Sequence, residues 1–315
     1  MTLQAQVIND PKYIPVLDHG FVGLVDTLGT DASIVQAARV SYGDGTKTVR
    51  EDRGLIRYLM RHRHTSPFEM CQVKIHIKMP IFVMRQWVRH RTASLNEYSG
   101  RYSVMTDEFY VPEMNVIQPQ SIDNKQGRAG EMSAEDRQRA RDLMSDTYRQ
   151  TYDAYKLLLG ERDTGEDLPD GACNEHDGFS DDYNGIAREM ARSVLPVGNY
   201  TELYWTQNLH NMMHLLKLRM DPHAQYEIRA YAEAVYALIA DIYPAALEAF
   251  DDYVRGSVNV SRMERTLLRV IMASEDTPSV ALAKLREGFE SDTKFAEHYE
   301  LSVREYREFK ETWGL

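Results

Sequence analysis

Hydrophobic and polar residues alternate most regularly between residues 73 and 79. The apolar positions are Val73, Ile75, Ile77 and Met79, and the residues between them are Lys74, His76 and Lys78. A period of two over this length predicts a β-strand with one face toward the core. Residues 14–26 are apolar and rich in β-branched side chains on both sides of Asp18-His19-Gly20, which predicts a strand and a turn near the start of the fold.

A helical period is found in much of the remaining chain. Helices are predicted over residues 31–40, 49–63, 81–91, 133–159, 183–196 and 200–220, and a further helix is predicted to begin at Asp221-Pro222. We expect Asp31 to cap the first of these helices, and Ser66, Pro67 and Glu69 predict one more helix start. The predicted apolar faces consist of Leu55, Tyr58, Leu59 and His62; of Leu143, Met144, Tyr148, Tyr152, Tyr155, Leu158 and Leu159; and of Ile228, Tyr231, Val235, Leu238 and Ile242.

The predicted helix over residues 200–220 is mostly apolar, but polar residues interrupt it. These are Asn208, His210, Asn211, His214 and Arg219. At 100° per residue, Asn208 and Arg219 fall within about 20° of each other and roughly 16 Å apart along the helix axis. This predicts polar groups on one helix face that meet both ends of an extended ligand.

Two polar segments interrupt the pattern. Residues 104–131 contain two prolines and scattered glycines and are predicted to form a long surface excursion, and residues 161–182 form an acidic loop that includes Cys173. Gly256-Ser257 indicates a domain boundary. We therefore expect a main domain over residues 1–254, with excursions at about 104–131 and 161–182, and a helical C-terminal extension over residues 255–315 of unknown role.

Composition narrows the possible functions. The 315 residues are 43% hydrophobic and 27% charged, which indicates a soluble globular protein. A net charge of -11 argues against a general nucleic-acid binder, whose phosphate-facing surface is basic. We find no run of about 18 apolar residues and no signal-peptide pattern, and the two cysteines predict neither a disulfide framework nor a metal cluster. The chain is expected to be cytoplasmic, with no membrane or nucleic-acid partner.

The segment from Arg89 to Arg101 has the highest density of candidate chemistry. It contains three arginines, a histidine, two serines, an asparagine and a glutamate directly after an apolar run. An arginine fork matches the geometry of phosphate or carboxylate, and serine hydroxyls with backbone N–H groups can complete an anion cradle. A solvated basic turn has the same charge content, so the segment alone leaves both interpretations open.

Other chemistries are less well supported by the residues. His210 and His214 have the i, i+4 spacing of zinc ligands and His223 follows, but the H-E-x-x-H pattern is absent, so no metal site is expected. Ser94 and Ser99 lie near His90 and Glu97, but neither has a G-x-S-x-G context. Cys71 at a strand start and Cys173 in an acidic loop are poor thiolate nucleophiles. No G-x-G-x-x-G follows the first strand, so a dinucleotide would be held without a Rossmann crevice.

The same segment resembles the signature of the flavin-dependent thymidylate synthases. It fits R-H-R-x-x-S-x-N-x-x-S-x-R at all seven fixed positions, which are Arg89, His90, Arg91, Ser94, Asn96, Ser99 and Arg101. Further segments resemble the family over roughly residues 14–254, outside the excursions. They are residues 64–69, 80–83, 85–87, 191–192, 195–196, 218–219 and His223-Ala224-Gln225.

The resemblance implies a fold and a reaction. The fold is a helix-rich α+β fold with a central, mostly antiparallel sheet that binds flavin without a Rossmann crevice. The reaction is methylation of dUMP to dTMP for dTTP biosynthesis, with 5,10-methylenetetrahydrofolate as carbon donor, NADPH as reductant and FAD as hydride carrier. Family members resemble one another in forming homotetramers whose active sites are shared between subunits, and no covalent enzyme nucleophile is required.

The resemblance also implies roles for individual residues. The expected catalytic residues are Arg219, His64 and Ser99, with Arg219 stabilising negative charge on the uracil ring. The expected dUMP-binding residues are Gln86, Trp87, Val88, Arg89, Glu97, Tyr98, Ser99, Gly100, Arg101, Arg192 and Arg219. The expected FAD-binding residues are Ser66, Arg89, His90, Arg91, Glu97, Asn208, Leu209, His210 and His214. His210 and His214 depart from the family pattern, in which arginine and asparagine are expected.

Two competing functions remain. One is a non-catalytic RNA-binding module that uses Arg85, Arg89, Arg91 and Arg101, which the acidic net charge disfavours. The other is a flavoprotein oxidase or reductase without a folate step. A yellow colour of the purified protein would argue against the first, and omission of folate from the assay would identify the second.

Overall fold

The computed structural model describes residues 10–40, 49–122, 127–161, 179–180 and 182–315. The chain forms two compact units, Met1–Phe250 and Asp251–Leu315. Within the described residues, no helix is both long and apolar enough to cross a membrane. The predicted acidic loop with Cys173 falls largely outside the described residues.

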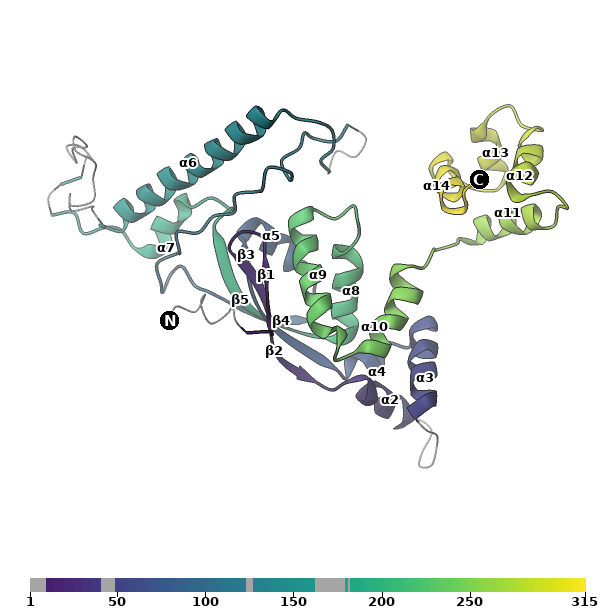
Figure 1. Ribbon diagram of the computed structural model, residues 1–315, viewed down its shortest axis with the longest axis horizontal. Coiled ribbons are helices and arrows are strands. Elements are labelled where there is room, and N and C mark those ends of the chain that lie inside the picture. Colours follow the sequence, from purple (N-terminus) through teal and green to yellow (C-terminus); the bar gives the residue numbers. More distant parts are fainter. Residues whose placement is uncertain (1–9, 41–48, 123–126, 162–178, 181) are drawn as a thin grey trace. The chain divides into compact units, whose positions relative to one another are not determined.

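A five-stranded antiparallel sheet lies at the centre of the first unit (Figure 1). Its strands, in spatial order, are β1 (Tyr13–Val16), β2 (Gly20–Leu28), β3 (Gln72–Pro80), β5 (Tyr200–Asn208) and β4 (Ala93–Glu97). Every neighbouring pair is antiparallel, from Val16 opposite Gly20 to Glu97 opposite Leu203. The predicted α+β class is therefore confirmed, as are the strand over residues 73–79 and the strand and turn over residues 14–26.

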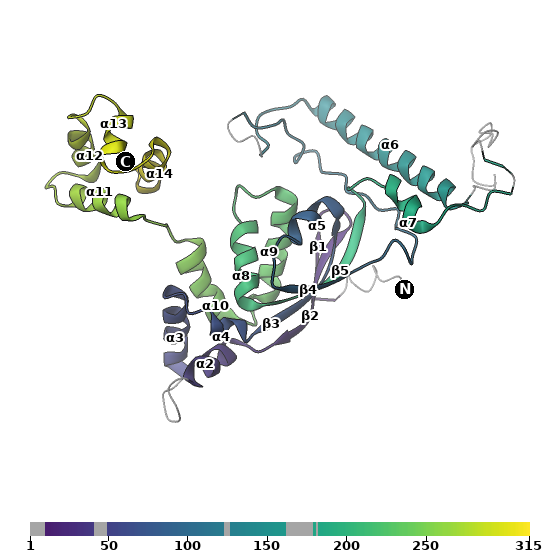
Figure 2. The same ribbon diagram turned by 180° about the vertical axis from the view of Figure 1, so that it is seen from behind.

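Three helices cover one face of the sheet. They are α5 (Ile81–Trp87), α8 (Leu209–Arg219) and α9 (Tyr226–Ala240). Figures 1 and 2 show α8 and α9 side by side on this face, where they contact β1, β2, β3 and β5. The odd-numbered residues of β3 point into this core, and Val73, Ile75, Ile77 and Met79 are all fully buried. Burial of aliphatic side chains on this scale is the main source of stability for the unit.

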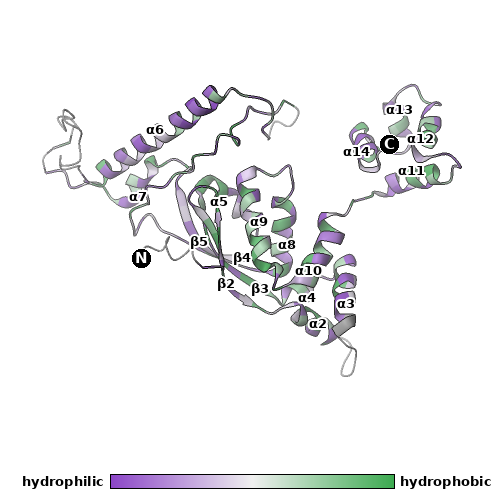
Figure 3. Cartoon of the chain, viewed as in Figure 1, coloured by the Kyte–Doolittle hydropathy of each residue, from purple (hydrophilic) through white to green (hydrophobic). Residues whose placement is uncertain are grey.

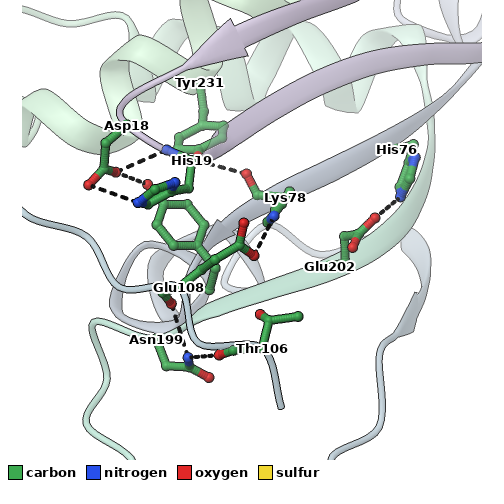
Figure 4. Close-up of polar contacts among 10 residues, drawn as sticks. Asp18, His19, His76, Lys78, Thr106, Glu108, Asn199, Glu202 and Tyr231 are labelled. Carbon is green, nitrogen blue, oxygen red and sulfur yellow. Dashed lines mark hydrogen bonds and ion pairs between the residues drawn. The ribbon is translucent and has the colours of Figure 1, made fainter. Parts of the chain in front are cut away.

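On the opposite face of β3, the polar residues His76 and Lys78 are also buried, whereas Gln72 and Lys74 are exposed. Lys78 Nζ pairs with Glu108 at 2.6 Å, and His76 Nε2 lies 2.9 Å from Glu202 (Figure 4). Asn199 donates to the carbonyls of Thr106 and Glu108, at 2.9 and 3.0 Å. Buried charges require such partners, because an unpaired charge loses its hydration without compensation.

These contacts correct the prediction that residues 104–131 form only a surface excursion. Its first part packs on the sheet, and the side chains of Met105, Phe109, Tyr110 and Ile117 are buried. The carboxylate of Asp18 accepts the backbone N–H of Val111 at 2.8 Å, which ties the segment to the β1–β2 turn. The polar residues and prolines of the segment predict a surface position, and they do not indicate that its few apolar side chains pack on the sheet.

The predicted helix over residues 200–220 is wrong in its first half. Residues 200–208 form β5 in the sheet, and only residues 209–219 form the helix α8. Asn208 is the N-cap of α8, and its Oδ1 accepts the backbone N–H of Asn211 at 2.9 Å. Asn208 and Arg219 therefore lie at opposite ends of α8, as its cap and its last residue.

A helical layer at one end of the sheet corrects several predicted caps. It contains α2 (Asp31–Arg39), α3 (Val49–Arg61), α4 (Ser66–Glu69) and α10 (Pro244–Phe250). Thr30, not Asp31, is the N-cap of α2, and the Asp31 carboxylate instead accepts the N–H groups of Ala245 and Ala246 at the start of α10. Thr65, not Ser66, is the N-cap of α4. Asp31 therefore joins two helices that are distant in the sequence.

The apolar faces of two helices differ from their predictions. Among the described side chains of α3, Ile56 and Leu59 are buried, whereas Tyr58 is exposed, as is His62 just after the helix. The long helix α6 (Ala134–Leu158) buries only Tyr155, and Figure 3 shows it as mainly hydrophilic. Leu143, predicted as a core residue, is 69% exposed.

The predicted helix over residues 183–196 is shorter than expected, since it comprises only α7 (Arg188–Ala191) and η2 (Arg192–Val194). The helix predicted from Asp221-Pro222 begins at Tyr226, with Gln225 as its N-cap.

The second unit has its own hydrophobic core. After the π-helix η3 (Asp251–Arg255), it contains α11 (Arg262–Met272), α12 (Pro278–Arg286), α13 (Asp292–His298) and α14 (Val303–Trp313). Capping boxes at Ser261 and Ser302 define the starts of α11 and α14. Leu267, Ile271, Phe295 and Phe309 are almost fully buried within the unit.

Candidate functional site

The segment from Arg89 to Arg101 consists of a turn, a strand and a loop. The turn follows α5, with the N–H of His90 bonded to the carbonyl of Trp87 at 3.1 Å. Residues 93–97 form β4, an edge strand of the sheet. Thr92 joins turn and strand with φ of 62°, a value that β-branched residues rarely adopt. The two ends of the segment are therefore separated by the length of a strand.

Arg219 lies against the turn, at the C-terminal end of α8. Its Nε–H donates to His90 Nε2 at 2.8 Å, and its Nη2 donates to the backbone carbonyl of Gln86 at 3.4 Å. The Gln86 side chain in turn donates to Gln225 Oε1 at 2.5 Å. These four residues, named here the Arg219 cluster, bring together α5, the turn, α8 and the start of α9.

Burial and charge set the protonation of this cluster. His90 is 7% exposed, and burial, followed by the charge of Arg219 and by His214, lowers the pKa of His90 to about 4. The imidazole is therefore neutral at neutral pH. Burial also lowers the pKa of Arg219, which stays cationic because guanidinium titrates far above neutrality. The cluster thus contains one positive charge and no carboxylate.

Exposed arginines surround the turn. Arg85, Arg89 and Arg91 are exposed, and their guanidinium groups pair with no acidic side chain in the described part of the chain. Unpaired arginines close to a partly buried arginine repel one another and attract anions. This observation favours the anion-binding interpretation of the segment over a solvated turn.

A second group of candidate residues lies beyond the other end of β4. Gly100 is buried, and a Cβ atom there would meet Met105 Sδ at 2.8 Å and Arg192 Cδ at 3.2 Å. The absence of a side chain therefore lets Arg192 lie close to the backbone of the motif. Arg101 pairs with Glu189 at 3.1 Å, and its N–H donates to Ser99 Oγ at 3.3 Å. We call Ser99, Gly100, Arg101 and Arg192 the Arg192 cluster.

The predicted nucleotide-binding residues between the two clusters have different exposures. Glu97 is exposed, and its Oε1 accepts the hydroxyl of Thr201 at 2.7 Å. Tyr98 is 40% exposed and donates to the carbonyl of Val104 at 2.7 Å. Trp87 is fully buried, and its carbonyl accepts the N–H of His90. Val88 is half-buried, directly before Arg89.

The predicted flavin-binding residues of α8 begin at its N-terminus. Asn208 caps the helix and is half-buried, as is His210, whereas His214 is exposed, with its ring centroid 6.4 Å from that of His90. Leu209 is fully buried, and its N–H donates to the carbonyl of Cys71 at 2.9 Å. Ser66 is exposed on α4, which packs against α8.

His64 belongs to a group of exposed rings at the end of α3. Its ring centroid lies 5.9 Å from that of Tyr58 and 6.4 Å from that of His62, and the Tyr58 and His62 rings are 4.4 Å apart. Exposed aromatic rings in this arrangement can stack on a planar heterocycle. Among the described residues, no hydrogen bond connects His64 with the Arg219 cluster.

A cavity of about 790 Å³ borders the Arg219 cluster at Gln225. Its lining includes Arg128, His223, Tyr226 and Arg229. Gln225 was not among the residues expected to bind a ligand, although it belongs to the His223-Ala224-Gln225 segment that resembles the family. That resemblance was the available signal for including it.

Metal and thiol chemistry find no support among the described residues. They contain no group of three or more His, Cys, Asp or Glu side chains that could hold a metal ion. Cys71 is fully buried, and burial, with a smaller effect of Asp31, raises its pKa to about 11. A thiol with this pKa is a poor nucleophile at neutral pH. Cys173 lies outside the described residues.

Known proteins resemble this chain over most of its length. The family described as thymidylate synthase complementing protein matches residues 23–245. A flavin-dependent thymidylate synthase of Ruegeria pomeroyi is 45% identical over 300 residues, 95% of this chain and 87% of the relative. One of Thermus thermophilus is 49% identical over 265 residues, 84% of this chain and 88% of the relative.

A solved structure gives the same result for the fold. The UMP/dUMP methylase PolB of Streptomyces cacaoi, bound with 5-Br dUMP, matches this chain with a TM-score of 0.64 and 34% sequence identity. The match covers 77% of this chain and 99% of the PolB chain. The same protein bound with 5-Br UMP has a TM-score of 0.62. By sequence and by fold, the chain belongs to the flavin-dependent thymidylate synthase family.

Proposed function

We propose that this chain catalyses the reductive methylation of dUMP to dTMP, with 5,10-methylenetetrahydrofolate as carbon donor, NADPH as reductant and FAD as the bound flavin. This reaction would serve dTTP biosynthesis. The observation that most favours it is the Arg219 cluster, in which a positively charged guanidinium is held without a carboxylate beside three exposed arginines. The names of the relatives support the same reaction.

The nucleotide phosphate is assigned to arginines. Arg89, Arg101 and Arg192 provide guanidinium forks that match the oxygens of a phosphate monoester. Arg101 is bonded to Glu189, but both side chains are more than half exposed, so a phosphate can replace this pair at little cost. Ser99, Gly100 and the backbone around them contribute further donors next to Arg192.

Arg219 is assigned to the uracil ring. The Nη1 group of Arg219 donates to no acceptor among the described residues. The opposite edge of the same guanidinium, with Nε and Nη2, is already bonded to His90 and to the carbonyl of Gln86. A preorganised cation placed where negative charge develops stabilises a transition state more than the ground state. Arg219 would therefore favour charge accumulation on the ring as its carbon becomes nucleophilic.

The residues assigned to FAD fit an anionic dinucleotide. Arg89 and Arg91 are exposed and unpaired within the described chain, which suits a pyrophosphate, and Ser66, Glu97, Asn208, His210 and His214 supply polar groups. When bound, FAD would transfer the hydride that originates from NADPH. The antiparallel sheet offers no Rossmann crevice, so the grip depends on these side chains. His64, in its exposed ring group, is assigned to the flavin and folate rings.

We further propose a homotetramer with active sites shared between subunits. Gln86 and His90 of the Arg219 cluster come before β4 in the chain, and Ser99 to Arg101 of the Arg192 cluster come after it. The five residues of β4 extend over about 13 Å at roughly 3.3 Å per residue. One mononucleotide would more readily contact both types of cluster if they came from different subunits. The separation of the clusters along the strand supports this arrangement.

The proposal is tested with the purified protein. We expect a yellow protein with a flavin absorbance band, and thymidylate production that requires dUMP, methylenetetrahydrofolate and NADPH together. Flavin reduction that is indifferent to folate, with no thymidylate formed, would instead identify an oxidase or reductase. Protein without flavin that forms no thymidylate would reject the proposal.

Arg219→Ala tests the assigned charge role. By analogy with one oxyanion-hole donor, we expect a loss of about 3–4 kcal/mol of transition-state stabilisation, roughly 10²–10³-fold in kcat. Lys217→Ala, an exposed cation on the same helix, is the matched control and should retain activity. Near-normal turnover of Arg219→Ala would contradict this assignment.

A further inference from the structure

The contact between His90 and Arg219 connects residues that are 129 positions apart in the sequence. A guanidinium has five N–H groups in one plane. The bonds to His90 Nε2 and to the Gln86 carbonyl use the Nε–H and one Nη2–H, both on the same edge. Because the group is planar, fixing this edge also fixes the direction of the opposite edge, which contains Nη1.

His90 is itself held firmly enough to orient Arg219. Its ring is almost fully buried, and its N–H is bonded to the carbonyl of Trp87 at the end of α5. The next carbonyl, of Arg91, accepts the side-chain amide of Gln207 on β5 at 3.0 Å. The turn is therefore anchored to both a helix and a strand, and the position of the His90 ring follows from these anchors.

The Nε–H···Nε2 contact defines the tautomer of His90. Nε2 accepts the hydrogen bond from Arg219, so it carries no proton, and the proton of the neutral ring lies on Nδ1. The charged or titratable groups that face the ring are Arg219 and His214 of α8, and its neighbours in the turn are the exposed Arg89 and Arg91. None of these is acidic, so the surroundings oppose a second proton on the ring.

A neutral partner has a consequence that a carboxylate would not have. Aspartate or glutamate could also hold the guanidinium, but an ion pair would offset the positive charge of Arg219 and weaken its attraction for an anionic ligand. Neutral imidazole accepts the hydrogen bond and leaves the full charge on Arg219. The pair therefore combines fixed geometry with an undiminished cation.

From this geometry we infer that His90 is a positioning residue, which aims the Nη1 edge of Arg219 at the nucleotide while leaving its charge intact. The inference rests on the proposed reaction, in which Arg219 contacts the uracil ring. It differs from the flavin-contact role that the family resemblance implies for His90, because Nε2 is occupied by Arg219 and only Nδ1–H can serve another group.

Three substitutions separate geometry from charge. His90→Gln places an amide oxygen near the former Nε2, His90→Leu removes the acceptor, and His90→Glu provides an acceptor with a negative charge. We expect kcat/KM for dUMP to stay within about 3-fold in His90→Gln and to fall roughly 10- to 100-fold in His90→Leu, the range for a lost hydrogen bond to a charged group. In His90→Glu, calorimetric dUMP binding should weaken even though the contact is retained. His298→Leu, at an exposed histidine of α13, is the control.

A double-substitution cycle shows whether His90 acts through Arg219. If it does, His90→Leu should have almost no further effect on kcat/KM in an Arg219→Ala background. Multiplicative losses would overturn the inference, as would a His90→Leu enzyme with parental kinetics. A merely structural role of His90 would lower the stability of both backgrounds without this dependence.

A readout without turnover separates this inference from the proposed function. In protein labelled with ¹⁵N-arginine, the Arg219 Nε–H should exchange slowly with solvent in the parent and in His90→Gln, and rapidly in His90→Leu. Slow exchange that persists in His90→Leu would refute the positioning role. A parent protein that forms no thymidylate would reject the proposed function, while the exchange measurement would still decide whether His90 holds Arg219.

Discussion

Replacing Glu227 with alanine is expected to destabilise the first unit by about 3–4 kcal/mol. Glu227 is only 3% exposed, and its carboxylate accepts from Arg128 Nη2 at 3.1 and 3.2 Å and from the Tyr110 hydroxyl at 3.0 Å. Breaking a buried ion pair from one side costs about 3–5 kcal/mol, because the remaining charge keeps its desolvation penalty. The Arg128 side chain is 31% exposed, so partial hydration places the value near the lower limit.

The series of variants follows from these contacts. Tyr110→Phe removes one hydrogen bond and should cost about 1 kcal/mol. Replacing both charged partners, as Arg128→Met with Glu227→Gln, leaves no unpaired charge and should cost less than Glu227→Ala alone. Glu233→Ala is the matched control, since Glu233 lies on the same helix and its side chain is 57% exposed.

Urea unfolding monitored by tryptophan fluorescence measures these differences. The chain has three tryptophans, and Trp313 lies in the second unit, so a Trp313→Phe background leaves Trp87 and Trp205 to report on the first unit. Changes in midpoint at constant m-value then give the change in unfolding free energy. A midpoint for Glu227→Ala equal to that of Glu233→Ala would refute the argument that this carboxylate ties residues 104–131 to α9.

Three further predictions concern single residues. Folding lowers the pKa of His90 from 6.5 to about 4, so the folded state binds fewer protons than the unfolded state. The contribution of His90 to the free energy of unfolding is therefore complete above pH 6.5 and is lost as pH falls toward 4, by about 2 kcal/mol at pH 5. Urea midpoints of the parent and His90→Gln between pH 5 and 8 check this, and parallel curves would contradict it. Thr92→Gly should raise stability by about 1 kcal/mol in the same assay, because φ of 62° strains a β-branched residue, and a lower midpoint would contradict that view. Asp31→Ala should lower it by about 1 kcal/mol through loss of the α10 cap, whereas Asp26→Ala, in β2, is the control.

The period of apolar residues predicts a helix or strand best where one packing contact decides which side chains are buried. Residues 73–79 alternate because one face of β3 meets α5 and α8, and the strand followed directly from that alternation. Residues 200–220 are mostly apolar over a length that is typical of a helix, which predicts one helix across β5 and α8. The tyrosines, threonines and tryptophan of β5 favour a strand, and this signal was outweighed by the length of the apolar run.

Caps and long-range contacts were harder to predict for a physical reason. A carboxylate before a helix can cap that helix or another one, and Asp31 caps α10, more than 200 positions away. The candidate site also depends on contacts between residues that are far apart in the sequence. The signature residues were identified by resemblance, but no local pattern predicts that His90 meets Arg219 or that Gln86 meets Gln225, since both pairs depend on how α8 and α9 return to the sheet.

The structure also explains the spacing within the signature. Ser94 and Asn96 are two positions apart on β4, opposite Thr206 and Tyr204, and therefore project from the same face of the strand. The preceding R-H-R forms the anchored turn, and the following S-x-R begins the loop that approaches Arg192. The signature is thus a turn, an edge strand and a loop, and not one contiguous cradle. Its two cationic ends are held apart by the strand, so an insertion of even one residue between Thr92 and Glu97 would reverse the faces of Ser94 and Asn96 or shift one cationic end relative to the other.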